Sequence, residues 1–112
     1  MKIQQSTPTL KTELPERLNL CSYLLDARIT EGHGARAAIR TATSILNFSE
    51  VKTLSEDYAR ILARDNIKPK ERVIVVLPDT PDFVGALFGV LRLGSIAVLV
   101  SPDAPKDLLS YF

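Results

Sequence analysis

The chain has 112 residues, of which 14 are Lys or Arg and 13 are Asp or Glu, so its net charge at pH 7 is near +1. This length suits one domain of ordinary size, and the balanced charge provides no long-range field for a nucleic acid or an anionic membrane. Nucleic-acid binding is therefore not expected. The single cysteine, Cys21, cannot form an internal disulfide, which favours a reducing, cytoplasmic compartment.

The N-terminal third of the chain begins with a polar stretch and continues into a first helix. Residues 1–16 contain no apolar run of signal-peptide length and are expected to be a flexible lead-in. Asn19 suits the N-cap of a helix, and Gly32 suits the left-handed position at its end. The apolar positions of this helix are Leu20, Tyr23, Leu24 and Ala27.

Two short extended stretches follow, AAIRT at residues 37–41 and ILNF at residues 45–48, separated by small polar residues. Their β-branched and aromatic content predicts a hairpin. Ser49 is then expected to open an amphipathic helix, with charged side chains on its other faces. The apolar stripe of that helix is Val51, Leu54, Tyr58, Ile61 and Leu62.

The most apolar part of the chain predicts a β-α-β unit. The run VIVVL at residues 73–77 and the run IAVLV at residues 96–100 lack polar alternation, as expected of parallel strands that are covered on both faces. Between them, residues 81–93 predict a buried helix that ends at Gly94. The crossover of such a unit should be right-handed.

The turn LPDTPDF, residues 77–83, explains how the strand becomes a helix. Thr80 can cap the helix, Pro81 suits the first helical position, and Asp82 favours the positive end of the helix dipole. Gly85 and Gly89, four residues apart, would let another backbone approach closely. The 18-residue run at 83–100 reaches the lower limit of a membrane span, but Arg92 lies in its middle, so no span is expected.

Few residues suggest chemistry. His33 is the only histidine, and GHGARA at residues 32–37 follows a helix rather than a strand, which is the wrong context for a dinucleotide-binding motif. Asp79 and Asp82 follow the carboxyl end of a strand, where α/β proteins often bind ligands, and a magnesium or general-base role is conceivable there. Helix capping explains both residues without further assumptions and is the preferred interpretation. The basic turn with Lys68, Lys70 and Arg72 is interpreted as a solvated surface. We therefore predict no catalytic, cofactor-binding or metal-binding residue in this chain.

The order of these segments resembles the N-terminal part of the AMP-forming acyl-CoA synthetases, the adenylate-forming superfamily. The resemblance covers about residues 17–103, and YLLD, EGHG and LPDTPDF are similar to the benzoate and aromatic acid CoA ligases. The chain departs from the usual pattern where Lys70-Glu71 replaces Gly-Asp and where Phe48 replaces a common tyrosine. The fold that the resemblance implies is α/β, with residues 17–112 forming a truncated part of the large N-terminal domain.

The resemblance implies that the complete enzyme activates a carboxylic acid with ATP and Mg²⁺ and then transfers the acyl group to coenzyme A. The family's phosphate loop, ribose-binding aspartate and C-terminal lysine have no counterparts in this sequence, so the chain alone should be inactive scaffold. Its expected partner is the remainder of the ligase fold or a complementary chain, with self-association through exposed apolar surface. Two alternatives are a freestanding, non-catalytic interaction module and a small nucleotide-binding domain.

Overall fold

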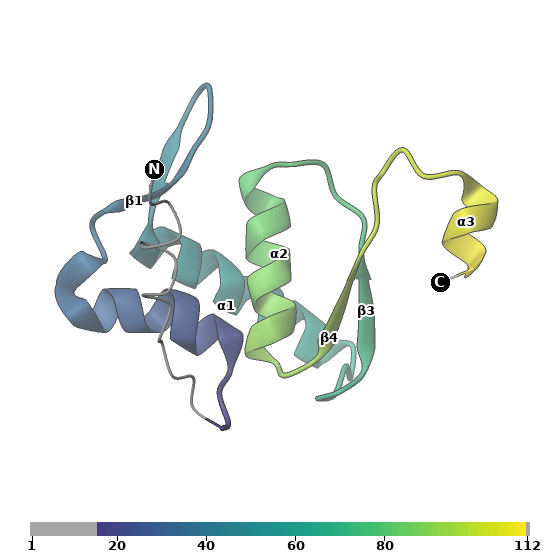
Figure 1. Cartoon of the computed structure of the whole chain (residues 1–112), viewed down its shortest axis with the longest axis horizontal. Coiled ribbons are helices and arrows are strands. Elements are labelled where there is room, and N and C mark those ends of the chain that lie inside the picture. The colour runs from purple at the N-terminus through teal and green to yellow at the C-terminus, as the bar shows by residue number, and fades with distance from the viewer. Residues whose placement is uncertain (1–15, 112) are drawn as a thin grey trace, which may run out of the picture.

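The structure is a computed structural model that describes residues 16–111, and Figure 1 shows the order of its elements. A helical segment over residues 20–33 comes first, with π-helical turns at Ser22–Asp26 (η3) and Ile29–His33 (η4). The strands are β1 (Ala37–Arg40), β2 (Ile45–Asn47), β3 (Arg72–Val75) and β4 (Ile96–Leu99), and the helices are α1 (Phe48–Arg64), α2 (Pro81–Arg92) and α3 (Lys106–Tyr111). The expected lead-in, residues 1–16, lies outside the described residues except for Glu16.

The strands form two separate pairs. β1 and β2 are an antiparallel hairpin, and β3 and β4 are parallel and joined through α2. The expected α/β fold, with a first helix, a hairpin, a second helix and a parallel β-α-β unit, is confirmed. The structure places α2 on one side of the β3–β4 pair and α3 on the other (Figure 1).

The first helix begins at the expected cap, and Gly32 takes the expected left-handed conformation, but the helical segment continues to His33 and a different face is buried. The side chain of Asn19 accepts hydrogen bonds from the backbone N–H groups of Cys21 and Ser22, and Gly32 has a φ of 93°. Cys21 and Leu25 are buried, whereas Leu20 and Leu24 are about half exposed. Both pairs are four residues apart, so helical spacing alone could not show which pair faces the core.

The long helix α1 starts two residues earlier than expected. Asn47, not Ser49, is its N-cap: the Asn47 side chain accepts from the N–H of Glu50, and the Glu50 carboxylate accepts from the N–H of Asn47. This capping box satisfies two backbone donors that would otherwise lack partners. Ile61, expected in the apolar stripe, is exposed, and Ser55 is buried in its place.

The turn into α2 follows its expected chemistry. Thr80 caps the helix, Pro81 occupies the first position, and Asp82 lies in the first turn. Residues 76 and 77, expected to continue the strand, lie outside β3, which pairs with β4 only as far as Val75. At the other end α2 stops at Arg92, and Gly94 takes a φ of 80°.

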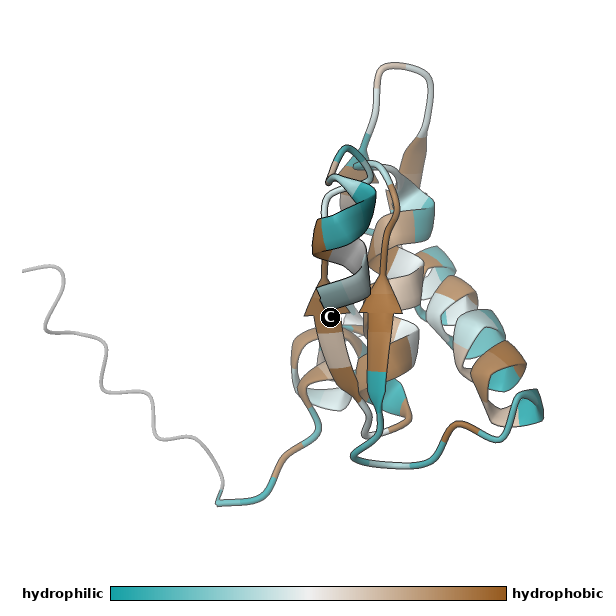
Figure 2. Ribbon diagram, turned by 90° about the vertical axis from the view of Figure 1, so that its right-hand side faces the viewer, coloured by the Kyte–Doolittle hydropathy of each residue, from teal (hydrophilic) through white to brown (hydrophobic). Residues whose placement is uncertain are grey.

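α2 covers one face of the β3–β4 pair, whereas α3, on the other side, leaves Ile74 and Ile96 exposed. Val73, Val75 and Ala97 pack into a core cluster with the buried α2 residues Ala86 and Val90. On the opposite face, which we call the open sheet face, lie Ile74, Ile96 and Val98, and the first two of these are 42% and 47% exposed. Apart from Arg72 at the start of β3, both strands are apolar (Figure 2). The expected cover on both faces is thus incomplete within residues 16–111.

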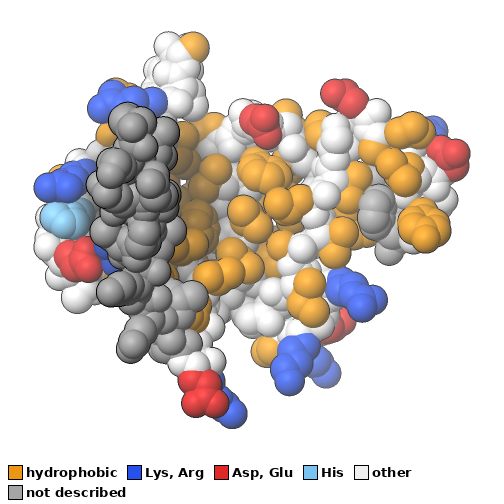
Figure 3. Space-filling model, in the orientation of Figure 1, with side chains coloured by type: hydrophobic (Ala, Val, Ile, Leu, Met, Phe, Trp, Pro, Cys, Tyr) orange, Lys and Arg blue, Asp and Glu red, His pale blue; other side chains and the backbone are white. Residues whose placement is uncertain are grey.

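Apolar side chains also gather on the outer surface of the molecule. In the view of Figure 3 they cluster over α2, the strand pair and α3, while the charged side chains lie nearer the rim. None of the helices within residues 16–111 is both long enough and apolar enough to cross a membrane. The run at 83–100 is instead divided between α2 and β4.

Candidate functional site

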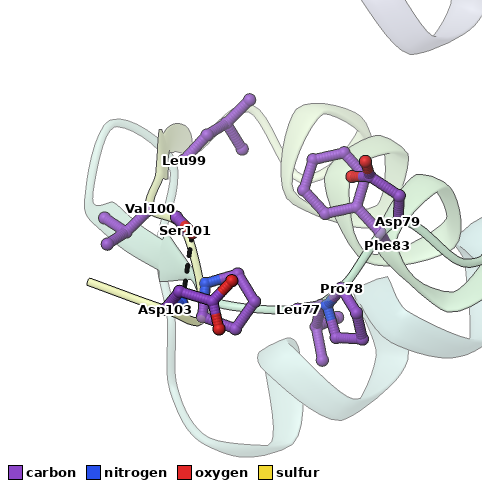
Figure 4. Close-up of a pocket in the computed structure, with 9 residues that line it drawn as sticks. Leu77, Pro78, Asp79, Phe83, Leu99, Val100, Ser101 and Asp103 are labelled. Atoms are coloured by element: carbon purple, nitrogen blue, oxygen red, sulfur yellow. Dashed lines mark hydrogen bonds between the residues drawn. The ribbon is translucent and has the colours of Figure 1, made fainter.

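A cavity of about 460 Å³ lies where β3 and β4 end and α2 begins (Figure 4). Its walls are apolar side chains of Leu77, Phe83, Leu99 and Val100, and its polar groups come from the two connecting segments. The carboxyl ends of parallel strands are a common place for ligands in α/β sheets, because the connections diverge there and leave a crevice. This cavity is therefore the first candidate for a site.

The backbone at this cavity is shaped by two proline-containing turns. Pro78 lies in the segment that follows β3, and Pro102 lies in the turn that follows β4. In that second turn the N–H of Asp103 donates to the hydroxyl of Ser101 at 3.1 Å. The two turns supply most of the lining, and Leu99 of β4 and Phe83 of α2 complete it.

The acidic side chains of this region do not converge. Asp79 and Asp103 stand on opposite sides of the cavity (Figure 4). Asp82 does not line it and instead accepts a hydrogen bond of 3.1 Å from the Tyr58 hydroxyl, which ties the start of α2 to α1. Burial and this carboxylate raise the pKa of Tyr58. The structure therefore does not bring Asp79 and Asp82 together as a carboxylate pair.

A charged network beneath α2 was not predicted from the sequence. The Arg92 guanidinium donates two hydrogen bonds to the Asp26 carboxylate, at 2.8 and 3.0 Å, and two to the hydroxyl of the fully buried Ser55. Ser55 in turn donates to the Lys52 carbonyl at 2.7 Å. These bonds, with the charge of Arg92, hold the pKa of Asp26 below its usual value.

This network joins elements and encloses a thiol rather than facing a cavity. It connects η3, α1 and α2, and Cys21 lies beside it with no exposed surface. Burial raises the pKa of the Cys21 thiol, and the charge of Arg92 opposes that shift. A buried thiol with a raised pKa is a poor nucleophile, so the network is structural. In the sequence, the feature that pointed to this network was Arg92, the one charged residue in an apolar run. The sequence did not show which residue would pair with Arg92.

The other sequence candidates remain apart from the cavity. His33 lies at the end of η4, and the GHGARA segment leads from that helix into β1, so the context of a dinucleotide motif is absent, as expected. Lys68, Lys70 and Arg72 are exposed. Among residues 16–111 no group of three or more His, Cys, Asp or Glu side chains is placed to hold a metal ion. The divided carboxylates at the cavity do not fit Mg²⁺, and no glycine-rich loop borders it to hold the phosphates of ATP.

Comparison with known proteins gives the family. The AMP-binding enzyme family matches residues 25–112, most of the chain. The chain belongs to the AMP-binding enzyme family. Its relatives in this family include a 3-hydroxybenzoate/4-hydroxybenzoate CoA ligase of Thauera aromatica, 24% identical over 84% of the chain. A 4-coumarate CoA ligase of Nicotiana tabacum is 31% identical over 80%, and triostin synthetase I of Streptomyces triostinicus is 33% identical over 70%.

Solved structures show the same fold. The anthranilate CoA ligase AuaEII, solved with anthranoyl-AMP, superposes on 88% of the chain with a TM-score of 0.78 and 21% identity. A benzoate CoA ligase from Burkholderia xenovorans LB400 superposes on 85% with a TM-score of 0.73 and 24% identity. The α/β fold of this AMP-binding family member is thus that of the N-terminal domain of adenylate-forming CoA ligases.

The match covers only a small part of each relative. The chain spans 18% of the hydroxybenzoate ligase, 16% of the coumarate ligase and 19% of the AuaEII chain. The family consists of ATP-dependent ligases, and the relatives of this chain include both CoA ligases and a dimodular nonribosomal peptide synthase of Bacillus subtilis. The family is therefore established, while the substrate class is a matter for proposal.

Proposed function

We propose that this chain is the N-terminal scaffold segment of an AMP-forming carboxylic acid CoA ligase that acts on an aromatic acid. The whole enzyme would join the acid to ATP to give acyl-AMP and pyrophosphate, and would then form the acyl-CoA thioester. ATP, Mg²⁺ and coenzyme A would be held by parts of the enzyme outside residues 16–111. The proposed compartment is the cytoplasm.

One observation carries this proposal more than any other. The motifs YLLD, EGHG and LPDTPDF are similar to those of aromatic acid ligases, as noted above. The chain that carries them superposes with a TM-score of 0.78 on a ligase of anthranilate, which is an aromatic acid. Two relatives in sequence also have aromatic acids in their names, hydroxybenzoate and coumarate. The relatives also include a nonribosomal peptide synthase, which is why the acid stays a proposal.

The lining of the cavity supports the scaffold role. The cavity at the strand ends has apolar walls and separated carboxylates, and neither arrangement activates a phosphate or a carboxylate. The charged network of Arg92, Asp26 and Ser55 is used to hold three elements together. The contribution of this chain is accordingly to position the strand pair and its turns.

Pyrophosphate exchange tests both parts of the proposal. The isolated chain, given ATP, Mg²⁺ and benzoate, is expected to show no ATP–pyrophosphate exchange above a blank without protein, and exchange above that blank would contradict the scaffold role. The longer protein that carries this segment is then assayed with benzoate, 4-hydroxybenzoate, 4-coumarate and a set of amino acids. A preference for an amino acid would overturn the aromatic acid assignment.

A second candidate is a freestanding interaction module, and the open sheet face favours it as well. Ile74 and Ile96 on that face need a cover, which a separate partner chain could supply. The two candidates differ in the size of the natural protein. An antibody or mass-spectrometric measurement in the source cells should find this segment in a polypeptide much larger than 12.4 kDa if it belongs to a ligase.

A further inference from the structure

The free edge of β3 borders an apolar groove that separates this strand from α1. The groove has a volume of about 330 Å³, and Figure 2 shows α1 standing beyond the edge of the strand pair. Most of its lining comes from three elements, and Val76 and Leu77 follow directly after β3. The residues from the three elements are Tyr58 and Leu62 of α1, Val73, Ile74 and Val75 of β3, and Ala86 and Val90 of α2.

The helix layer is wider than the sheet that it covers. α2 packs on the β3–β4 pair, and α1 packs closely along α2, because Gly89 brings the α1 backbone against it. Packed helices are about 8–10 Å apart, whereas neighbouring strands are about 4.8 Å apart. A strand placed next to β3 would therefore lie beneath the α1–α2 seam, over the groove.

The backbone of β3 is ready to pair on this side. The carbonyls of Glu71 and Val75 accept hydrogen bonds from β4 and its continuation, at Ile96 and Val100. Backbone groups alternate in direction along a strand, so those of Arg72, Ile74 and Val76 point to the free edge. No strand within residues 16–111 pairs with that edge.

The two ends of the groove carry opposite charge. Lys68, Lys70 and Arg72 are exposed where β3 begins and outnumber the one exposed carboxylate among them, that of Glu71. Asp79 and Asp82 are exposed where the chain leaves β3 for α2. A strand that runs parallel to β3 would meet the basic end with its first residues and the acidic end with its last. Charge complementarity thus selects a strand that begins with an acidic residue and ends with a basic one.

We propose that the β3 edge and its groove bind an extended strand that runs parallel to β3, with apolar side chains at alternate positions, an acidic residue at its start and a basic residue at its end. The backbone of this strand pairs with Arg72, Ile74 and Val76, and its apolar side chains enter the groove between Tyr58, Leu62 and Val90. A parallel partner continues the direction of the pair already present, as in sheets with helices on both faces. This proposal rests on the proposed scaffold role, because the bound strand is the element that the scaffold would hold in place.

The test uses the 112-residue chain and the heptapeptide acetyl-DVTVTVK-amide, with amide hydrogen exchange followed by NMR. The peptide is expected to bind saturably and to slow exchange of the Ile74 amide. Methylating the backbone nitrogens of the three valines, whose N–H groups would face β3, should abolish binding, while methylating those of the two threonines, which face outward, should not. Leu62→Lys should weaken binding about tenfold or more, whereas the matched control Ile61→Lys, on the exposed side of α1, should not.

Each result that differs from these expectations contradicts a specific part of the proposal. Absence of binding, or equal binding of both methylated peptides, rejects strand pairing at this edge. Tighter binding of acetyl-KVTVTVD-amide rejects the parallel direction. Protection of the Ile74 amide that appears without peptide and grows with protein concentration assigns the edge to a second copy of the chain. Because none of these readouts involves ATP, their failure leaves the ligase proposal to the exchange assay.

Discussion

Gly89 decides how closely the backbones of α1 and α2 approach each other. A Cβ atom at this position would lie 2.7 Å from the Tyr58 Cβ and 3.0 Å from the Ala59 nitrogen and the Ser55 carbonyl oxygen. Two of these atoms belong to the backbone of α1, so the clash cannot be relieved by turning a side chain. The close approach expected from the glycine spacing is confirmed.

Replacing Gly89 is therefore expected to separate the two helices. Gly89→Leu should lower the free energy of unfolding by more than about 1 kcal/mol, because overpacking forces a backbone shift. Urea unfolding followed by circular dichroism measures the loss. The control Ala63→Leu, at an exposed position of α1, should change stability by less than about 0.5 kcal/mol. Equal effects of the two variants would show that the α1–α2 seam is loose.

The Asp26–Arg92 pair should make stability depend on pH in the acidic range. The pKa of Asp26 is lower in the folded chain than in the unfolded chain, where it is about 3.9. The ionised carboxylate therefore adds its full stability at pH values above the unfolded-state pKa. This stability is lost as the pH falls through the folded-state pKa. At pH 7 Asp26→Asn should cost about 1.5–3 kcal/mol. The difference in melting temperature between wild type and Asp26→Asn should narrow below about pH 4.

A matched control separates this pair from surface charge. Asp57→Asn removes the partner of Arg60 in an exposed ion pair of α1, and its cost should stay within about 0.5 kcal/mol at pH 7. A difference between wild type and Asp26→Asn that stays constant from pH 7 to pH 3 would contradict the assignment of the acid loss to Asp26.

Among the elements, α1 depends on a local signal at its first turn. The side chain of Asn47 and the N–H of Glu50 are 2.7 Å apart, and the reciprocal bond from the Asn47 N–H to Glu50 is 2.8 Å. Asn47→Ala removes the cap and should lower the free energy of unfolding by about 1 kcal/mol. Thr53→Ala, on an exposed turn of the same helix, should not lower it. Similar losses for both in thermal melts would mean that the capping box is not needed.

Local chemistry explains which parts of the fold could be predicted. The Asn19 cap, the Thr80-Pro81 start of α2 and the glycine at Gly94 each depend on neighbours within a few residues, so the sequence shows them directly. The Asn47 cap was missed because Ser49 offered a second cap two residues later. Helix boundaries shift in this way when two capping residues compete.

Features that depend on distant residues could not be predicted. The partner of Arg92 is 66 positions away, at Asp26, and no periodicity connects the two. The cavity at the strand ends and the β3 groove likewise arise from the packing of elements. Burial of Leu25 rather than Leu24 was also decided by tertiary contacts, since both fit the same helical spacing. The absence of catalytic residues stays a prediction, because only assays test it.

For the whole molecule, we expect the open sheet face to govern association in solution. Ile74 and Ile96 are exposed on it, and a contiguous apolar surface of more than a few hundred Å² promotes association. The chain is expected to self-associate at low micromolar concentration, measured by light scattering and by binding of a hydrophobic dye. Ile96→Lys should reduce both signals, whereas Ile45→Lys, at an exposed position of the hairpin, should not. A wild-type chain that stays a monodisperse monomer and binds no dye would contradict this.

The two long-distance bonds of the first helix affect the order of events during protein synthesis. The Asn19 side chain donates to the carbonyl of Leu91, which is 72 positions later in the chain. Asp26 likewise accepts from Arg92, which is 66 positions later. At about 5–20 residues per second, a ribosome needs roughly 4–14 s to make the intervening chain. The first helix therefore cannot reach its final place until α2 has left the exit tunnel. Until α2 emerges, the cluster of Cys21, Leu25 and Val51 lacks Val84, Phe88 and Leu91 of α2, so the Cys21 thiol is less protected from cellular oxidants in the nascent chain than in the folded protein.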